Sequence, residues 1–185
     1  GGGLDTGTIA NSTWYHWYLI AKADGSLPAV IFSTNATSPT LPATYTLYRR
    51  IFSWKTNGSA QWDRVTQLGD TFYMASVDDY STTSATSLTL RTLSVPTGLI
   101  VEPVLQGYGY ANGPGTQITV APAADITATR LLLYMAAGGG TVLYVNGFAR
   151  SVPTNTSAQI YVGTIASAAQ TLRTAGWVDR RGKDS

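Results

Sequence analysis

The sequence predicts an all-β fold: an antiparallel β-sandwich of jelly-roll-like type, with about a dozen short strands and little helix. Three observations support this. Apolar and polar residues alternate with a period of two in many short segments, as they do in half-buried strands. Residues that favour turns close these segments at short intervals. Threonine (27 of 185 residues) and serine (15) are abundant while charged residues make up only 12%, and threonine suits the solvated face of a strand.

The first long strand is expected over residues 13–23. Trp14, His16 and Tyr18 fall on one side of it, and Tyr15 and Trp17 fall on the other, because successive side chains of a strand point to opposite faces. Both faces are therefore rich in aromatic residues. Such a strand needs cover on both sides, and we expect a second sheet or a partner chain to provide it.

The remaining strands follow in short segments separated by turn residues. They are expected at 29–33, 44–55, 60–67, 70–76, 87–93, 98–107, 117–121, 127–135, 141–146, 159–165 and 171–178. The Asp24-Gly25 pair predicts a hairpin between the first two, because both residues tolerate a positive φ. Helix is expected at most as a single turn near 121–128 or 165–170.

The chain is expected to form one main domain. Residues 1–12 are expected to form a linker and a first short strand, residues 13–179 a single β-sandwich, and residues 180–185 a C-terminal tail. A soft boundary is expected near 94–98, because aromatic residues dominate before it and small residues after it. Two small β subdomains are the alternative organisation.

Composition argues against several classes of protein. The net charge of +2 is too small to indicate a nucleic-acid partner. The absence of cysteine excludes thiol catalysis, thiolate metal sites and disulfides. No apolar run is long enough to predict a membrane span. Four Asn-x-Ser/Thr matches, at Asn11, Asn35, Asn57 and Asn155, are expected to arise by chance in a chain so rich in serine and threonine.

The sequence predicts no catalytic site and no cofactor. His16 is the only histidine and lies in the middle of an aromatic strand, which indicates a core or interface position. Glycoside hydrolysis needs two facing carboxylates. The only glutamate, Glu102, lies in an apolar strand, and the adjacent Asp78 and Asp79 seldom converge on one substrate atom. A serine-histidine-aspartate triad would require His16, and no serine lies in a nucleophile elbow.

No metal ion is predicted, although a calcium ion stays open as an alternative. Aspartates occur in or beside expected turns, and a β-fold can bring such turns together. They are Asp24, Asp70, Asp78, Asp79 and Asp125. No EF-hand pattern accompanies them.

A sugar-binding site is the positive hypothesis. Sugars stack their apolar faces on aromatic rings while amides and carboxylates bind the hydroxyl groups. The segment 107–115, GYGYANGPG, is expected to be a loop that carries Tyr108, Tyr110 and Asn112, and Tyr80 and Asp79 are expected to contribute from the segment VDDYSTTS. The alternative is a hairpin tip whose tyrosines pack on a neighbouring subunit.

Blocks at both ends of the chain resemble a known family. They are GGLDTGTIANSTWYHWYLIAKADG, the following PAVIFSTNATSPTLPATYTLYRRIFSWKTNGS, and the end TNTSAQIYVGTIAS with LRTAGWVDRRGKD. They are similar to a family of uncharacterised structural proteins of tailed bacteriophages, in which a GGLDTG block, an FSTSAT-P-TLP-Y-RRI segment and a GW-DRRG end recur. The middle, residues 101–150, does not share the resemblance.

The resemblance implies a virion part, at the end of a tail fibre or another appendage. Fibre tips are usually trimeric, which suits a strand that is apolar on both faces. We therefore expect a non-enzymatic homotrimer in the virion that contacts other virion proteins and host surface polysaccharide. The alternative is a purely structural virion protein, such as a capsid-decorating or tail-assembly component.

Overall fold

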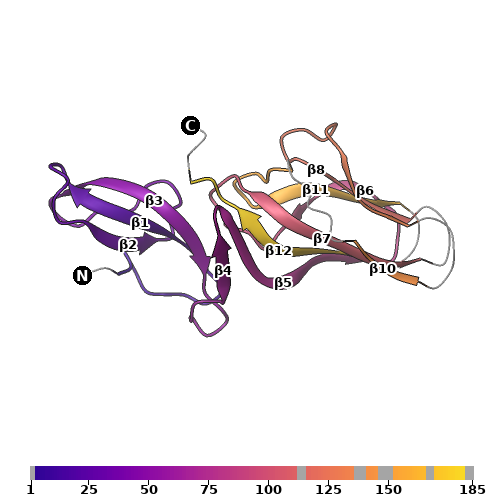
Figure 1. Ribbon diagram of the computed structural model, residues 1–185, viewed down its shortest axis with the longest axis horizontal. Coiled ribbons are helices and arrows are strands. Elements are labelled where there is room, and N and C mark those ends of the chain that lie inside the picture. Colours follow the sequence, from indigo (N-terminus) through magenta and orange to yellow (C-terminus); the bar gives the residue numbers. More distant parts are fainter. Residues whose placement is uncertain (1–2, 112–115, 136–140, 146–151, 166–168, 182–185) are drawn as a thin grey trace. The chain divides into compact units, whose positions relative to one another are not determined.

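The computed structural model describes residues 3–111, 116–135, 141–145, 152–165 and 169–181 (Figure 1). The fold is all-β and antiparallel, as the sequence predicts. The described strands are β1 (Trp14–Lys22), β2 (Ala29–Ser33), β3 (Tyr45–Lys55), β4 (Val65–Leu68), β5 (Thr71–Thr82), β6 (Thr86–Thr92), β7 (Glu102–Ala111), β8 (Thr116–Ala121), β9 (Arg130–Met135), β10 (Thr141–Val145), β11 (Gln159–Ile165) and β12 (Ala169–Val178). The described residues contain no helix at 121–128 or in any other segment.

The chain forms two compact units where one domain over 13–179 was expected. Unit 1 comprises residues 1–65, 96–98 and 180–185, and unit 2 comprises residues 66–95 and 99–179. The division falls at residue 65 because β1, β2 and β3 hydrogen-bond only to one another among the described strands. Within the segment 94–98, residues 96–98 belong to unit 1, and the residues on either side belong to unit 2.

Unit 1 is built on a three-stranded sheet with the order β2-β1-β3. The predicted hairpin at Asp24-Gly25 joins β1 to β2. Gly25 has a φ of 78°, and Asp24 accepts a hydrogen bond from the Ser26 amide at 2.9 Å. The hairpin predicted at Asp24-Gly25 is therefore confirmed, with glycine at the position of positive φ.

One face of this sheet is covered by the chain itself. Tyr18, Ile20 and Ile31 are buried there, and Leu41 and Tyr45 pack against them. His16 lies on the same face, is 1% exposed, and its Nδ1 is 2.9 Å from the Ser53 hydroxyl. The predicted core position of His16 is confirmed.

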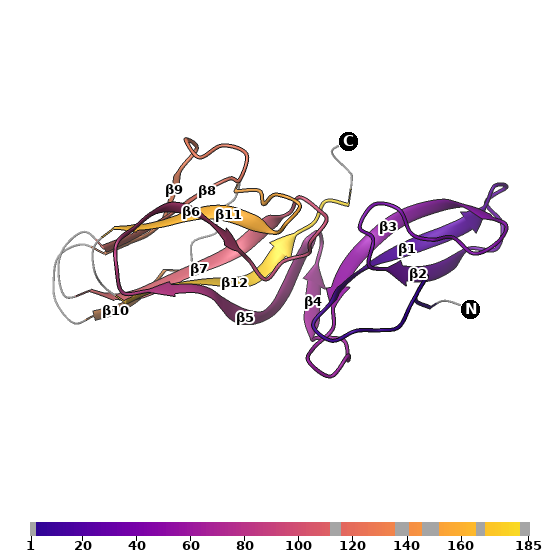
Figure 2. The same cartoon turned by 180° about the vertical axis from the view of Figure 1, so that it is seen from behind.

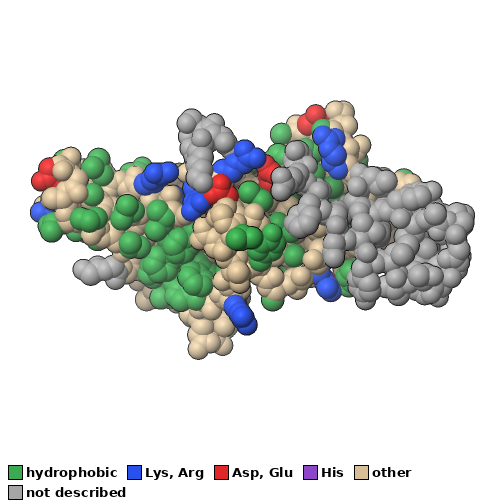
Figure 3. Space-filling model, in the orientation of Figure 1, with side chains coloured by type: hydrophobic (Ala, Val, Ile, Leu, Met, Phe, Trp, Pro, Cys, Tyr) green, Lys and Arg blue, Asp and Glu red, His purple; other side chains and the backbone are tan. Residues whose placement is uncertain are grey.

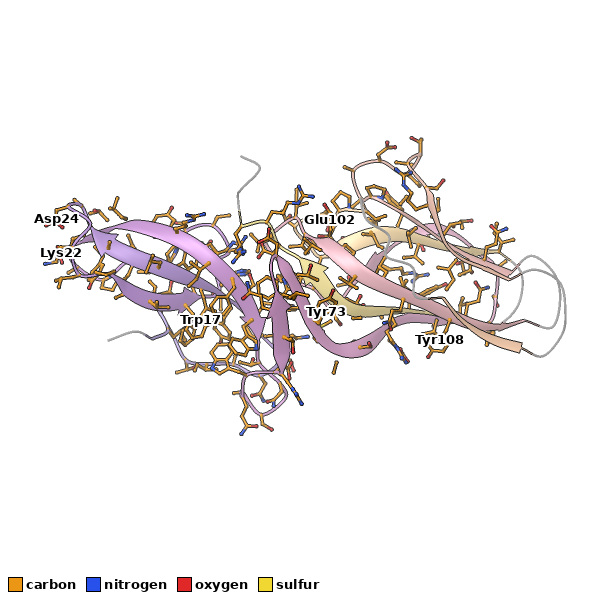
Figure 4. All side chains as sticks on the ribbon, viewed as in Figure 1. Trp17, Lys22, Asp24, Tyr73, Glu102 and Tyr108 are labelled. Carbon is orange, nitrogen blue, oxygen red and sulfur yellow. The ribbon has the colours of Figure 1, made fainter. Side chains whose placement is uncertain are left out.

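The opposite face carries a row of stacked rings. Trp17 lies between Phe32 of β2 and Phe52 of β3, with ring centroids at 4.9 and 5.2 Å. Trp62 lies across this row, 5.5 Å from Trp17 and edge-on to Phe32. Figure 4 shows Trp17 among these rings, and Figure 3 shows the apolar surface gathered there. The second sheet expected over this face is replaced in part by Trp62.

Unit 2 contains two sheets with the orders β10-β7-β12-β5-β4 and β6-β11-β8-β9. They form two layers, seen from both sides in Figures 1 and 2. From β5 to β12 the chain alternates between the layers except at the β8–β9 hairpin. This arrangement is consistent with the antiparallel β-sandwich that the sequence predicts.

Strand β12 is central to the larger sheet, between β5 and β7. Trp177 is fully buried and stacks on Phe72 of β5 at 5.2 Å. At the neighbouring position the backbones approach so closely that a Cβ on Gly176 would lie 2.0 Å from the Phe72 carbonyl oxygen. Only glycine fits there.

Two turns share a sequence pattern, Asn-x-Ser-Ala-Gln, and one hydrogen-bond pattern. Residues 57–61 read NGSAQ and residues 155–159 read NTSAQ. In each, the asparagine Oδ1 accepts bonds from the serine and glutamine amides, and the alanine has a positive φ of 57° or 59°. The Asn-x-Ser matches at Asn57 and Asn155 thus belong to the turns themselves.

Several strand boundaries differ from expectation. Residues 78–80 and 107–111 were expected in loops but belong to β5 and β7. The strand expected over 60–67 is confined to β4, because residues 57–61 form the turn described above and Trp62 makes only an isolated bridge to Thr56. Glycine and aspartate mark turns on average, but strand pairing outweighs that preference in β5 and β7.

The close approach at Gly176 generates the first prediction. Gly176→Ala forces β12 and β5 apart and is expected to lower the stability of unit 2 by about 3 kcal/mol. Thermal unfolding followed by circular dichroism measures this. Gly58→Ala is the control, since a Cβ there meets no atom within 4 Å. Equal melting temperatures for the two variants would contradict the register.

Candidate functional site

The outward face of the larger sheet of unit 2 carries two rows of polar and aromatic side chains. Asp78 of β5 is paired with Arg173 of β12, which is paired with Gln106 of β7. The second row is formed by Ser81, Thr171 and Tyr108 on the same three strands. We call these six residues the polar face.

Three members of the polar face are joined by direct contacts. Arg173 Nε donates to Asp78 Oδ1 at 2.5 Å, and the Tyr108 hydroxyl donates to Asp78 Oδ2 at 3.2 Å. Arg173 Nη2 lies 3.4 Å from the Tyr108 oxygen, and the guanidinium carbon lies 4.9 Å from the centre of the Tyr108 ring. Charge, hydrogen bonds and a cation–π contact therefore fix the three groups relative to one another.

A β-bulge lets Asp78 face outward. Leu172 is paired with Tyr80 and Arg173 with Asp78, so Asp79 is an extra residue on β5. Without the bulge Asp78 and Tyr80, two residues apart, would lie on the same face. With it, Asp78 meets Arg173 outside while Tyr80 faces the second layer.

Asp79 makes structural contacts. Its carboxylate accepts bonds from the Ser94 amide at 3.0 Å and the Ser94 hydroxyl at 2.7 Å, and it also accepts from the hydroxyl of Thr174, which is fully buried. These bonds tie the segment after β6 to β5 and β12. Asp79 therefore joins strands within unit 2 and is not part of the polar face.

Tyr80 is also engaged within unit 2. The guanidinium carbon of Arg91 on β6 lies 4.3 Å from the centre of the Tyr80 ring. The Tyr80 hydroxyl shares a 3.1 Å hydrogen bond with the hydroxyl of Thr86, which is also on β6. Tyr80 therefore links the two layers of the sandwich. It does not join the polar face.

The other two predicted contacts lie at the limit of what is described. Tyr110 belongs to β7 and is paired with Val142 of β10 in the backbone register. Asn112 lies outside the described residues. Of the five residues predicted from sequence, Tyr108 alone is placed on the polar face by its side chain; Figure 4 labels it on β7.

Arg173 was missed at the level of the sequence, and Asp78 was not counted among the ligand-binding residues. A signal was present: Arg173 is the one charged residue within the strand AQTLRTAGWV. A charged residue in a strand of otherwise uncharged residues indicates a side chain on the outward face, where a partner on a neighbouring strand can reach it. The identity of that partner depends on strand pairing, which the sequence does not display.

The ion pair sets the charge state of the site. The hydrogen bond from Arg173 and, next, that from Tyr108 lower the pKa of Asp78 below its usual value of 3.8. Asp78 is therefore a carboxylate at neutral pH, and with Arg173 it forms a pair without net charge. Both side chains remain open to solvent, at 45% and 32% exposure.

The aspartates weighed for calcium do not gather into a ligand set in the described part of the chain. No group of three or more histidine, cysteine, aspartate or glutamate side chains that could hold a metal ion occurs among the described residues. Asp24 and Asp125 instead cap their own turns by accepting bonds from Ser26 and Thr127. The described chain also has no helix long and apolar enough to cross a membrane.

No family model, curated protein or solved structure matches this chain.

The lowered pKa of Asp78 generates the second prediction. A depressed folded-state pKa adds stability that is present above the unfolded value near 3.8 and is lost as pH falls through the folded value. The melting temperature of the wild type should therefore be slightly higher than that of Asp78→Asn at pH 6. The difference should vanish as the pH falls below the folded-state pKa of Asp78. The gain is small because the pair is solvated.

Arg173→Gln is the partner variant and should show the same loss of pH dependence. Melting curves at low ionic strength measure both. A difference between wild type and Asp78→Asn that grows as pH falls below 3.8 would show that the ion pair does not stabilise the fold.

Proposed function

We propose that this chain is a non-enzymatic domain of a bacteriophage virion appendage, a tail-fibre or spike tip, that attaches to glycan on the bacterial surface. The observation that carries the proposal is the convergence of Tyr108, Asp78 and Arg173 on an outward sheet face. It supplies a ring, a hydrogen-bond acceptor and a donor in one place. These are the groups that sugar recognition needs.

Rigidity supports a binding role. The three side chains stand on adjacent strands of one hydrogen-bonded sheet and contact one another. A ligand meets groups that are already ordered, so less conformational entropy is lost on binding. The cysteine-free, low-charge β fold and the resemblance of both ends to tailed-phage structural proteins support the virion setting.

A purely structural virion role is the second candidate, and unit 1 favours it. Beyond the ring row, the same face of the three-stranded sheet carries Leu19 and Leu47, which are 44% and 47% exposed. Exposed apolar surface on a sheet is a common contact surface for another chain. The two candidates are compatible if unit 1 assembles and unit 2 binds.

The third prediction tests glycan attachment. Tyr108→Ala removes the ring and the hydroxyl bond to Asp78, and is expected to weaken adsorption to host cells about tenfold. Tyr108→Phe keeps the ring and should bind at an intermediate level. Adsorption of the purified, fluorescently labelled chain to cells measures both.

Tyr161→Ala is the matched control. Tyr161 lies on β11 between Ile160 and Val162, both fully buried, so it occupies the outward face of the other sheet. The Tyr161→Ala variant should adsorb to host cells as strongly as the wild type. Equal adsorption by the Tyr108 and Tyr161 variants, with both folded, would argue against the polar face as the attachment site.

The fourth prediction concerns assembly. We propose a homotrimer that covers the exposed part of the unit 1 sheet by closed cyclic symmetry. Light scattering at micromolar concentration should give three times the chain mass of 19.6 kDa. Leu19→Asp with Leu47→Asp should give the monomer mass, because charge cannot be buried there without a partner.

Leu90→Asp, at a residue of unit 2 that is 42% exposed, should leave the trimer intact. A monomer mass for the wild-type chain would overturn the proposed assembly. It would leave attachment through unit 2 to be judged by the adsorption experiment.

A further inference from the structure

The polar face contains its own counterion. Arg173 is bound through Nε to one oxygen of Asp78, and the Tyr108 hydroxyl is bound to the other. The positive charge that would attract an anionic ligand is therefore already matched by a carboxylate at contact distance. An anion bound to Arg173 would have to compete with Asp78 and lie beside it, with like charges repelling.

An uncharged hydroxyl group avoids this conflict. It carries one donor and two acceptor lone pairs, so it can donate to a carboxylate and accept from a guanidinium. Two hydroxyl groups on neighbouring ring carbons can bridge the two partners of an ion pair without breaking it. Asp78 and Arg173 lie directly opposite each other on adjacent strands, and both are partly exposed.

The remaining members of the polar face are uncharged and polar. Gln106 continues the row beyond Arg173, and its Oε1 lies 3.5 Å from the Ser76 hydroxyl. Ser81 and Thr171 share a 3.0 Å hydrogen bond in the next row. Gln106 and Ser81 can exchange hydrogen bonds with further hydroxyls, Thr171 is buried beneath them, and none of the three adds charge.

We propose that the polar face selects uncharged sugars through a pair of vicinal hydroxyl groups, with Asp78 accepting and Arg173 donating, and that it discriminates against carboxylated sugars. The inference rests on the proposed glycan attachment and names its ligand class. Tyr108 orients Asp78 through its hydroxyl and presents its ring beside the same ligand.

The charge balance predicts that substitution of Asp78 reverses the preference between neutral and carboxylated polysaccharide. Asp78→Asn removes the counterion and leaves Arg173 with unmatched positive charge. The variant should lose binding to neutral polysaccharide and gain binding to carboxylated polysaccharide. A gain for one class of polymer beside a loss for the other distinguishes this reversal from a general loss of binding, and a melting curve shows that the variant is folded.

The experiment is affinity electrophoresis of the full chain through gels that each contain one polysaccharide. Three of these polymers are neutral (mannan, galactan and dextran), and the fourth, polygalacturonate, is carboxylated. The wild type should be retarded by at least one neutral polymer and not by polygalacturonate. Asp78→Asn should show about tenfold weaker retardation by that neutral polymer and new retardation by polygalacturonate. Asp125→Asn makes the same charge change in an exposed turn away from the polar face, and should behave like the wild type.

The outcomes separate the inference from the function on which it rests. Retardation of the wild type by polygalacturonate alone would overturn the selectivity and leave glycan attachment standing. Retardation by a neutral polymer that Asp78→Asn does not change would also overturn the inference. No retardation by any of the four polymers would count against both the inference and glycan attachment.

Discussion

The insertion of β12 between β5 and β7 is the constraint on which unit 2 depends. The larger sheet is continuous only when this strand, the last described one, pairs with strands that precede it by many residues. Such pairing is non-local and fixes the register strictly. Gly176 permits the backbone approach to Phe72, Trp177 stacks on the same residue, and the extra residue Asp79 is taken up by a bulge on β5. All three features depend on the pairing of β12 with β5.

The same strand places the candidate site. Leu172 and Thr174 point into the sandwich and are fully buried, and Arg173 between them points out. Arg173 thereby reaches Asp78 on one neighbouring strand and Tyr108 on the other. The pairing that completes the fold also assembles the polar face. Binding and stability are thus linked through one strand, and substitutions within β12 should be judged by both readouts.

Much of the fold could be predicted from the sequence, but of the candidate site only Tyr108 could. Local alternation and turn residues located β2 and β11 at their observed bounds and the Asp24-Gly25 hairpin, because those signals act over a few residues. The division at residue 65 and the pairing of Arg173 with Asp78 depend on contacts between distant segments. Asp78, Asp79 and Tyr80 were expected in a loop, and the bulge at Asp79, which turns Asp78 outward, depends on the pairing of β5 with β12. The repeated NGSAQ and NTSAQ turns were visible in the sequence, and their role became clear only from the shared bonding.

The central claim is that the polar face is held ready by a rigid, centrally placed β12. Native-state amide hydrogen exchange tests it most directly. The amides of Thr171, Leu172 and Thr174 are predicted to exchange only through global unfolding of unit 2, at the slow rate shared by the paired segments of β5 and β7. Exchange of these amides by local opening, at rates near those of the exposed turn at 122–128, would contradict the account.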